Sequence, residues 1–437
     1  MQLGLMGLGY VVFSFKICYL KIDTLTVIFS VIYKWNIILL TSLTISFCYT
    51  SYDREIQLNL ILAEEGDTVE FDEGLIQLLG SLSLQDKGNL VIRGKGINRT
   101  IIDFSNQVGG KNGFNISNCK NILLEELTIL PKLGHAIHCV GSKNIVIRKV
   151  KTNWARKNFQ PVGDGFSINS SSDVIVDDCI NSSFISGISV EQSNNIVIRF
   201  SETFDNILGI TVANSINVDI HSNNIHHNSS GLYVYAVPDM AKKKSERIRI
   251  FNNIVRDNNG ENFSPFESIF SQVPTGQGIM IMASDFLEIF DNTIIDNKTA
   301  GTSIFSYPVI GEETKDAQYN PYSSSIFIHD NIYRRSSQMP TLNHMIGWFL
   351  FTRFYRNSPD IIFDGLYDPI YEKNKFLPYS RRLCLDNNIN AKYLNMNVKD
   401  NFSSPLMLFF TDYETNKTNC KCVQETLQPV IIRINDS

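Results

Sequence analysis

The sequence predicts an all-β fold, a right-handed, single-stranded parallel β-helix (a solenoid) of about ten coils, because two strand patterns alternate along it. The first pattern is polar, apolar, any, apolar, as at Asn195 and again at Asn217. The second pattern is glycine, apolar, any, apolar, as at Gly209 and Gly231. Each pattern therefore repeats after 22 residues, the first from 195 to 217 and the second from 209 to 231. Each coil alone buries little apolar surface, so neighbouring coils must stack to form a core.

Each pattern can be followed along most of the chain. An antiparallel sandwich is the alternative, but sandwiches lack a repeat that stays in phase over so many strands. The first pattern begins at Thr68, Asn89, Asn121, Asn144, Asp173, Asn195, Asn217, Arg247, Phe286 and Ser325, with Phe286 replacing the polar residue in one coil. The second begins at Gly113, Gly165, Gly187, Gly209, Gly231 and Gly278, with Ala136 replacing glycine in one coil.

The pattern divides the chain into three parts. Residues 1–50 are apolar and outside the repeat, 51–335 are predicted to form the β-helix, and 336–437 are predicted to be an irregular region that packs on it. Residues 56–63 read as a short amphipathic helix that caps the open end of the stack. Three insertions, at 153–164, 236–246 and 259–276, interrupt the coils and are expected to form loops that wall a binding groove.

The apolar N-terminal part resembles an export segment. Lys34, the run IILLTSLTISF and Cys48 have the order of a charged region, a hydrophobic region and a cleavage point. We therefore expect an exported protein of the periplasm or cell surface, with lipid attachment at Cys48 as one form of membrane attachment and a transmembrane pair as the alternative. A net charge of −5 argues against a nucleic-acid partner.

The cysteines near the C-terminus predict one disulfide. Cys384, Cys420 and Cys422 can form a single bond with one thiol left over, in an oxidising compartment, and the sequence leaves the pairing open. Cys139, by contrast, takes an inward position of a coil and is expected to be a small core residue.

Several stretches resemble one group of proteins. GINRTIIDFSNQ, the loop around Trp154, GLYVYAVPDM, RIFNNIVRDNNGENFSP and VPTGQGIMIMASDFLEIFDNTI are similar to bacterial exported "parallel β-helix domain-containing" proteins, within the pectate-lyase-like superfamily. The resemblance covers about residues 60 to 430. It implies a neighbourhood of polysaccharide lyases, C5-epimerases and hydrolases, which is an analogy of fold. QPVGDGFSI at 160–168 departs from the G-x-Y-G-L-Y-P run typical of the group.

Stacking in register predicts two outward ladders of side chains, with rungs about 4.8 Å apart. The first contains Asn115, His138, Ser167, Ser189, Thr211, Tyr233 and Met280. The second contains Ser117, Val140, Asn169, Glu191, Ala213, Tyr235 and Met282. The two ladders predict an aromatic and carboxylate patch beside the loops at 153–164 and 236–246.

This patch carries our candidates for chemistry on an acidic polysaccharide. A lyase or C5-epimerase must abstract the proton next to a uronate carboxylate, which requires a base and an acid. Tyr233 and His138 are the candidates for that pair, with Asp164 and Glu191 tuning the charge. The residues expected to bind sugar rings and carboxylates are Tyr235, Trp154, Arg156 and Lys242.

Other functions stay open at this stage. No cofactor is predicted, and calcium is the alternative. HSNNIHHN at 221–228 lacks the ligand spacing of a metal site. The Asn and Asp pairs after successive strands could bind calcium, but they suit turns and ladders better. The alternatives to a polysaccharide enzyme are a non-catalytic scaffold or binding module at the cell surface and a maturation factor for a periplasmic metalloenzyme.

Overall fold

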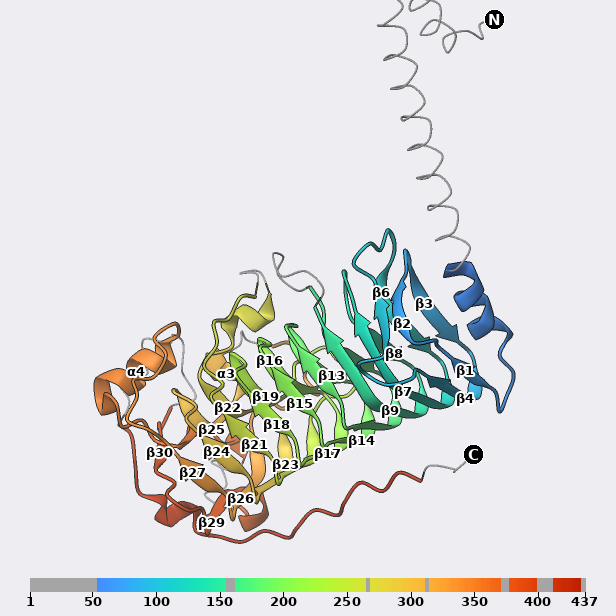
Figure 1. Cartoon of the computed structure of the whole chain (residues 1–437). Helices are drawn as coiled ribbons and strands as arrows, with labels where there is room; N and C mark the ends of the chain where they lie inside the picture. The colour runs from blue at the N-terminus through green and yellow to red at the C-terminus, as the bar shows by residue number, and fades with distance from the viewer. Residues whose placement is uncertain are drawn as a thin grey trace, which may run out of the picture. The chain divides into compact units, whose positions relative to one another are not determined.

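The computed structural model describes residues 53–154, 162–264, 268–310, 314–370, 377–398 and 412–433. Within the compact unit Gln57–Ser437, successive coils stack so that their strands lie side by side and parallel, in a 19-stranded sheet and an 11-stranded sheet (Figure 1). We call these sheet A and sheet B. The predicted export segment at 1–50, including Cys48, lies outside the described residues. No helix in the described ranges has the length and apolar character of a membrane span.

Sheet A has two arms, each contributing about one strand per coil. The first arm contains β1 (Thr68–Glu70), β4 (Gly88–Arg93), β7 (Lys120–Leu130), β9 (Lys143–Asn153), β11 (Ser172–Asp177), β14 (Asn194–Arg199), β17 (Ile216–His221), β20 (Glu246–Phe251), β23 (Asp285–Phe290), β26 (Ser324–His329) and β29 (Leu383–Asp386). The second contains β2 (Gly74–Gln77), β5 (Thr100–Asp103), β12 (Ile180–Ser182), β15 (Glu202–Phe204), β18 (Asn224–His226), β21 (Ile254–Arg256), β24 (Thr293–Ile295) and β27 (Ile332–Arg334). The long strands β7 and β9 pair with both arms.

Sheet B closes each coil. Its strands are β3 (Gly80–Gln85), β6 (Gly109–Ser117), β8 (Ile137–Val140), β10 (Phe166–Asn169), β13 (Ser186–Glu191), β16 (Leu208–Ala213), β19 (Ser230–Tyr235), β22 (Gln277–Met282), β25 (Ala300–Phe305), β28 (Ile361–Phe363) and β30 (Tyr393–Asn395). The helical elements are residues 53–62, η2 (Ile269–Gln272), α3 (Tyr307–Ile310), α4 (Met345–Phe354), η3 (Tyr379–Arg381) and η5 (Lys417–Cys420).

The predicted coils are present, and the stack continues beyond them. The ten first-pattern segments form or overlap strands of the first arm of sheet A, in the expected parallel order. The predicted boundary at residue 335 is not the end of the coils, because β28, β29 and β30 pair in parallel with the strands before them. Long connections separate these short strands, which hides the repeat from sequence reasoning.

A helix at the start of the stack protects the open strand edge, as predicted. The Gln57 side chain donates to the Ser83 carbonyl oxygen at 2.8 Å and accepts the Ser83 N–H at 2.9 Å. Leu60 is buried, and the Lys87 ammonium donates to the Ala63 carbonyl oxygen. The edge groups of β3 therefore find partners within the chain, which removes a site for strand addition.

Asparagine ladders run through the corners of the coils. Asn252 and Asp291 adopt left-handed φ values of 54°. The next residue, Asn253 or Asn292, points inward and is fully buried. The Asn292 Oδ1 accepts both the backbone N–H of Asn253 at 3.0 Å and its Nδ2–H at 2.9 Å. The Asn and Asp pairs therefore serve as turns and ladders, the interpretation that the sequence favoured over calcium.

The C-terminal region contains the predicted disulfide. Cys384 is bonded to Cys422, with 4.9 Å between their Cα atoms, and Cys420 is the thiol left over. From this bond the chain runs back along the first arm of sheet A (Figure 1). The Leu427 N–H donates to Glu288 at 2.9 Å and the Val430 N–H to Asp219 at 3.1 Å. This segment covers part of the outer face of the first arm of sheet A.

We predict that Asn292→Ala lowers the free energy of unfolding by about 2–5 kcal/mol, because it leaves two buried donors of Asn253 without an acceptor. The measurement is urea unfolding followed by circular dichroism. The exposed turn residue Asn106 provides the control, since Asn106→Ala should change the free energy by less than about 0.5 kcal/mol. Equal losses in the two variants would contradict the ladder's role.

Candidate functional site

The two outward ladders predicted on sheet B are confirmed by its register. His138 pairs with Ser167, Ser167 with Ser189, and the same row continues through Thr211 to Tyr233. The second row likewise joins Asn169, Glu191, Ala213, Tyr235 and Met282. Both rows face out of the coils, but only their N-terminal parts are accessible.

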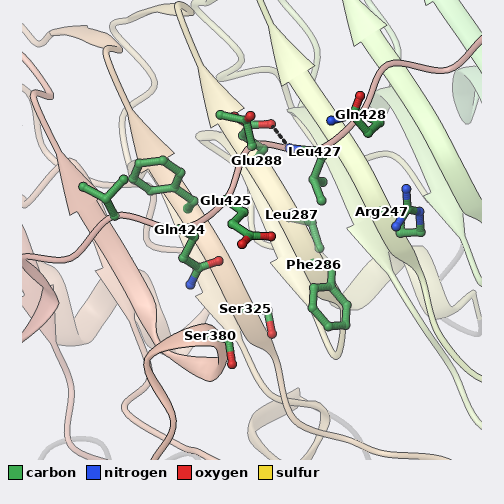
Figure 2. Close-up of a pocket in the computed structure, with 13 residues that line it drawn as sticks. Arg247, Phe286, Leu287, Glu288, Ser325, Ser380, Gln424, Glu425, Leu427 and Gln428 are labelled. Carbon is green, nitrogen blue, oxygen red and sulfur yellow. Dashed lines mark hydrogen bonds between the residues drawn. The ribbon is translucent and has the colours of Figure 1, made fainter.

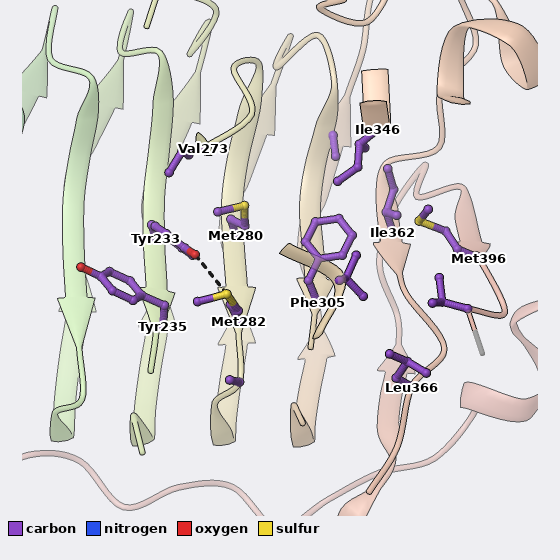
Figure 3. Packing of buried hydrophobic residues seen from close by; sticks show 14 of the residues in the cluster. Tyr233, Tyr235, Val273, Met280, Met282, Phe305, Ile346, Ile362, Leu366 and Met396 are labelled. Atoms are coloured by element: carbon purple, nitrogen blue, oxygen red, sulfur yellow. Dashed lines mark hydrogen bonds between the residues drawn. The ribbon is translucent and has the colours of Figure 1, made fainter. Parts of the chain in front are cut away.

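Beyond β13 the outer face of sheet B is buried under other segments. Tyr233, Tyr235, Met280, Met282 and Phe305 pack with side chains of the covering segments, and we call this the covering cluster (Figure 3). The two tyrosine rings stack with their centroids 4.4 Å apart, and the Tyr233 hydroxyl donates to the Met282 sulfur at 3.4 Å. Val273, Tyr319, Ile346, Phe349 and Leu350 belong to the covering side of this cluster.

Burial corrects two of the predicted roles. Tyr233 has 4% of its surface exposed, and burial raises its pKa well above the ordinary value, so its hydroxyl can neither reach a polysaccharide nor ionise readily. Tyr235 is 8% exposed and packs at the edge of the same cluster. Neither ring offers the open face that stacking on a sugar requires.

From β6 to β13 the same face is open and polar. His135 and His138 stack with ring centroids 5.2 Å apart. The Asp164 backbone N–H donates to Nδ1 of His135 at 3.0 Å, and an Asp164 carboxylate oxygen lies 3.3 Å from the same nitrogen. Because that nitrogen accepts the backbone proton, the neutral ring of His135 carries its own proton on Nε2.

The environment keeps His138 neutral near pH 7. Burial lowers the pKa of the His138 imidazole below its ordinary value and the neighbouring His135 lowers it further, while the Asp164 carboxylate opposes both. Its Nδ1 lies 3.3 Å from the Ser167 hydroxyl on the next coil. A half-exposed, uncharged imidazole held by a hydroxyl is suited to accept a proton.

Glu191 lies two coils further along the same face. Burial raises the pKa of its carboxyl and the nearby Asp164 carboxylate raises it further, whereas a hydrogen bond from Asn169 at 3.2 Å opposes the shift. Two rungs correspond to about 10 Å across the strands, and the step from the first row to the second adds about 7 Å along them. His138 and Glu191 therefore lie on either side of the half-buried surface formed by Ser167 and Asn169. A neutral imidazole can accept a proton, and a carboxyl that holds its proton more tightly than usual can donate one.

The remaining predicted binding residues are placed differently. Trp154 is 5% exposed and packs edge-on against Phe184, so it is part of the core and not a sugar platform. The Lys242 ammonium donates to the carbonyl oxygen of Gln192, and its backbone N–H to the Gln192 side chain at 2.9 Å. Lys242 thus fixes its own loop, and Arg156 lies outside the described residues.

His135 was not among the candidates, although the sequence held a signal for it. Asp164 directly precedes Gly165, and His135 directly precedes Ala136, the glycine equivalent in the coil before. The two residues therefore occupy the same position of successive coils, and stacking brings them together. Gly163 permits this approach, because a Cβ there would overlap the carbonyl oxygen of Gly134.

In the described part of the chain, no group of three or more His, Cys, Asp or Glu side chains is arranged to hold a metal ion.

A hollow of about 550 Å³ lies between the outer face of sheet A and the C-terminal segment (Figure 2). Phe286, Glu288 and Ser325 form its floor, with Gln424 and Glu425 above them. The chain's own segment occupies this face, so the open face of sheet B is the stronger candidate.

Comparison with known protein families agrees with the fold seen in the structure. A family model described as "Right handed beta helix region" matches residues 135–310. With the parallel register of sheets A and B, this match confirms the predicted right-handed parallel β-helix. A comparison with curated protein sequences gave no match.

Two of the solved structures with a similar fold are named as enzymes that act on polysaccharides. The A-module of mannuronan C-5 epimerase AlgE6 from Azotobacter vinelandii is 13% identical, with a TM-score of 0.49 over 77% of this chain and 90% of that one. An exopolygalacturonase from Thermotoga maritima is 13% identical, with a TM-score of 0.40 over 63% of this chain and 79% of that one. At this level of identity the likeness concerns the fold.

We predict that Asp164→Asn lowers the pKa of His138, because the carboxylate favours the charged imidazole. The replacement keeps a side-chain oxygen that can accept the Ser186 N–H. Titration of the imidazole ring protons by NMR measures the effect. His221, whose pKa is lowered by burial and by Arg199 and Arg249, should titrate unchanged and serves as the control. A His138 pKa that stays the same or rises would contradict the proposed cluster.

Proposed function

We propose that the chain is an exported protein that binds an acidic polysaccharide along the open part of sheet B, and that it acts there as a lyase or C5-epimerase. The observation that carries this proposal is the face from β8 to β13, on which a neutral imidazole, His138, and a carboxyl of raised pKa, Glu191, are both half-buried. Ser167 and Asn169 lie on the strand between them and Ser189 on the strand of Glu191. All three are half-buried, so they remain within reach of sugar hydroxyls.

The two reactions begin with the same step. His138 takes the proton from C5 of a uronate residue, and the electron pair passes into the carboxylate-stabilised enolate. In elimination the pair returns to form the C4–C5 double bond, the C4–O bond breaks, and the leaving oxygen takes a proton from Glu191. In epimerisation the C4–O bond stays intact, and Glu191 gives its proton to C5 on the face opposite His138, after which solvent reprotonates Glu191.

His135 and Asp164 act as positioning residues in this scheme. The stacked ring of His135 disfavours charge on His138, and Asp164 fixes the orientation of His135 through its backbone N–H. Neutralisation of the uronate carboxylate is the role that the sequence suggested for Arg156. The covering cluster ends the open face on its C-terminal side, because Thr211 and Ala213 are already buried.

The test uses the full chain with polymannuronate, polyguluronate and polygalacturonate in D₂O. Both reactions remove the hydrogen from C5, so proton NMR detects the loss of the H5 signal, which we call exchange. Epimerisation puts deuterium in its place, whereas elimination leaves C5 without hydrogen and produces an unsaturated product that absorbs in the ultraviolet. His138→Gln should reduce exchange by about 10²- to 10⁴-fold. Activity should rise with pH through the His138 pKa, on the acid side of the ordinary value of about 6.5, because the base must be unprotonated.

Tyr233→Phe is the matched control, since its buried hydroxyl contacts only the covering cluster and exchange should continue at the wild-type rate. Loss of exchange in this variant, with His138→Gln unaffected, would contradict the assignment of the base. Binding of a polysaccharide without exchange by the wild type would favour the non-catalytic scaffold.

A further inference from the structure

A hollow of about 430 Å³ near the C-terminal end of the solenoid is lined by basic side chains. Arg334 and Arg335 come from the end of β27, Arg356 from the turn after α4, and Lys392 from the residue before β30. Asp360 is the one carboxylate among the described residues that line it. The chain as a whole carries a net charge of −5, so this concentration of positive charge runs against its average.

Arg335 and Asp360 form the floor of this hollow and offset each other. The Arg335 side chain is 11% exposed, and its Nε lies 3.5 Å from an Asp360 oxygen. Its guanidinium also donates to the carbonyl oxygens of Asn297 at 2.6 Å and Ser358 at 3.3 Å. Asp360 in turn accepts the Lys392 backbone N–H at 3.0 Å. The buried pair is therefore satisfied within the protein and adds little charge to the cavity.

The other three cations have no such partner. Arg334, Arg356 and Lys392 are exposed, and none of them makes an ion pair with a carboxylate in the described ranges. Asp296, which faces Arg335 from the preceding coil, already accepts the Ser336 N–H at 2.6 Å and the Gln338 amide at 3.2 Å. Three exposed cations without a carboxylate in direct contact, placed around one hollow, favour a ligand with several negative oxygens.

We propose that this hollow binds the phosphate or sulfate group of a charged sugar. Arginine suits such a group because its planar guanidinium donates two parallel hydrogen bonds to an oxyanion. Ser336, Ser337, Asn357 and Asn390 add neutral donors and acceptors to the lining, as sugar hydroxyls require. The volume exceeds that of a bare oxyanion and leaves room for the sugar ring attached to it.

The test is isothermal titration calorimetry of the full chain with glucose 6-phosphate, glucose 6-sulfate, inorganic phosphate and glucose. We expect both sugar esters to bind more tightly than inorganic phosphate, with an affinity that falls as salt is added, and glucose to give no heat. The triple variant Arg334→Gln, Arg356→Gln, Lys392→Gln should weaken sugar-ester binding at least about tenfold, because each replacement removes a charged donor.

A triple variant of equal charge change, Lys111→Gln, Lys120→Gln, Lys417→Gln, is the control, because these exposed lysines do not line the hollow. It should bind the sugar esters as the wild type does. An equal loss in the control, or no binding of any anion by the wild type, would overturn the proposal. Inorganic phosphate binding as tightly as the esters would overturn the sugar part of it. His138→Gln should leave this binding unchanged, which separates this site from the proposed polysaccharide site.

Discussion

Hydrogen bonding between coils in strict register is the constraint on which this structure depends. Each strand must present the same backbone positions to the coil before it and the coil after it, so each position along a coil experiences nearly the same environment in every repeat. The glycine of the second pattern shows this directly: a Cβ on Gly187 would lie 2.7 Å from the Gly209 carbonyl oxygen, and one on Gly209 would lie 2.6 Å from that of Gly231. The inward asparagines follow the same logic, because each amide completes the hydrogen bonds of its neighbour.

The register decides which way a side chain points, but the covering segments decide whether solvent reaches it. Ser189 and Tyr233 belong to one row on the outer face of sheet B, yet Ser189 is half-buried and Tyr233 is almost fully buried. The difference comes from segments that leave the repeat, such as α4 and the residues around Tyr319, whose hydroxyl donates to the Ala236 carbonyl oxygen at 2.7 Å. An outward position is therefore necessary for chemistry on this face, without being sufficient.

This distinction explains what sequence reasoning could reach. The coil order, both outward ladders and the single disulfide follow from local patterns and were predicted; His138, Asp164 and Glu191 do share an open face. The burial of Tyr233 and Trp154 and the internal role of Lys242 depend on contacts between segments far apart in the chain. The late strands β28 and β30 were missed for a related reason: each has three residues, too few for a pattern of alternating polarity to be recognised.

The outer faces of the two sheets are covered by different segments, and this favours one stretch of sheet B as the proposed binding face. On sheet A the C-terminal segment lies across the strands, its Val430 and Ile432 packed against Val146, Ile175 and Val197. The carboxylates of Asp219 and Glu288 on that face accept backbone protons from the same segment and are therefore already engaged. On sheet B the covering cluster seals the surface from β16 onward. Within the described residues, the stretch from β6 to β13 combines accessibility, polar rungs and titratable groups of shifted pKa. The same register that builds the core also sets the spacing of those groups along the face that we propose for binding.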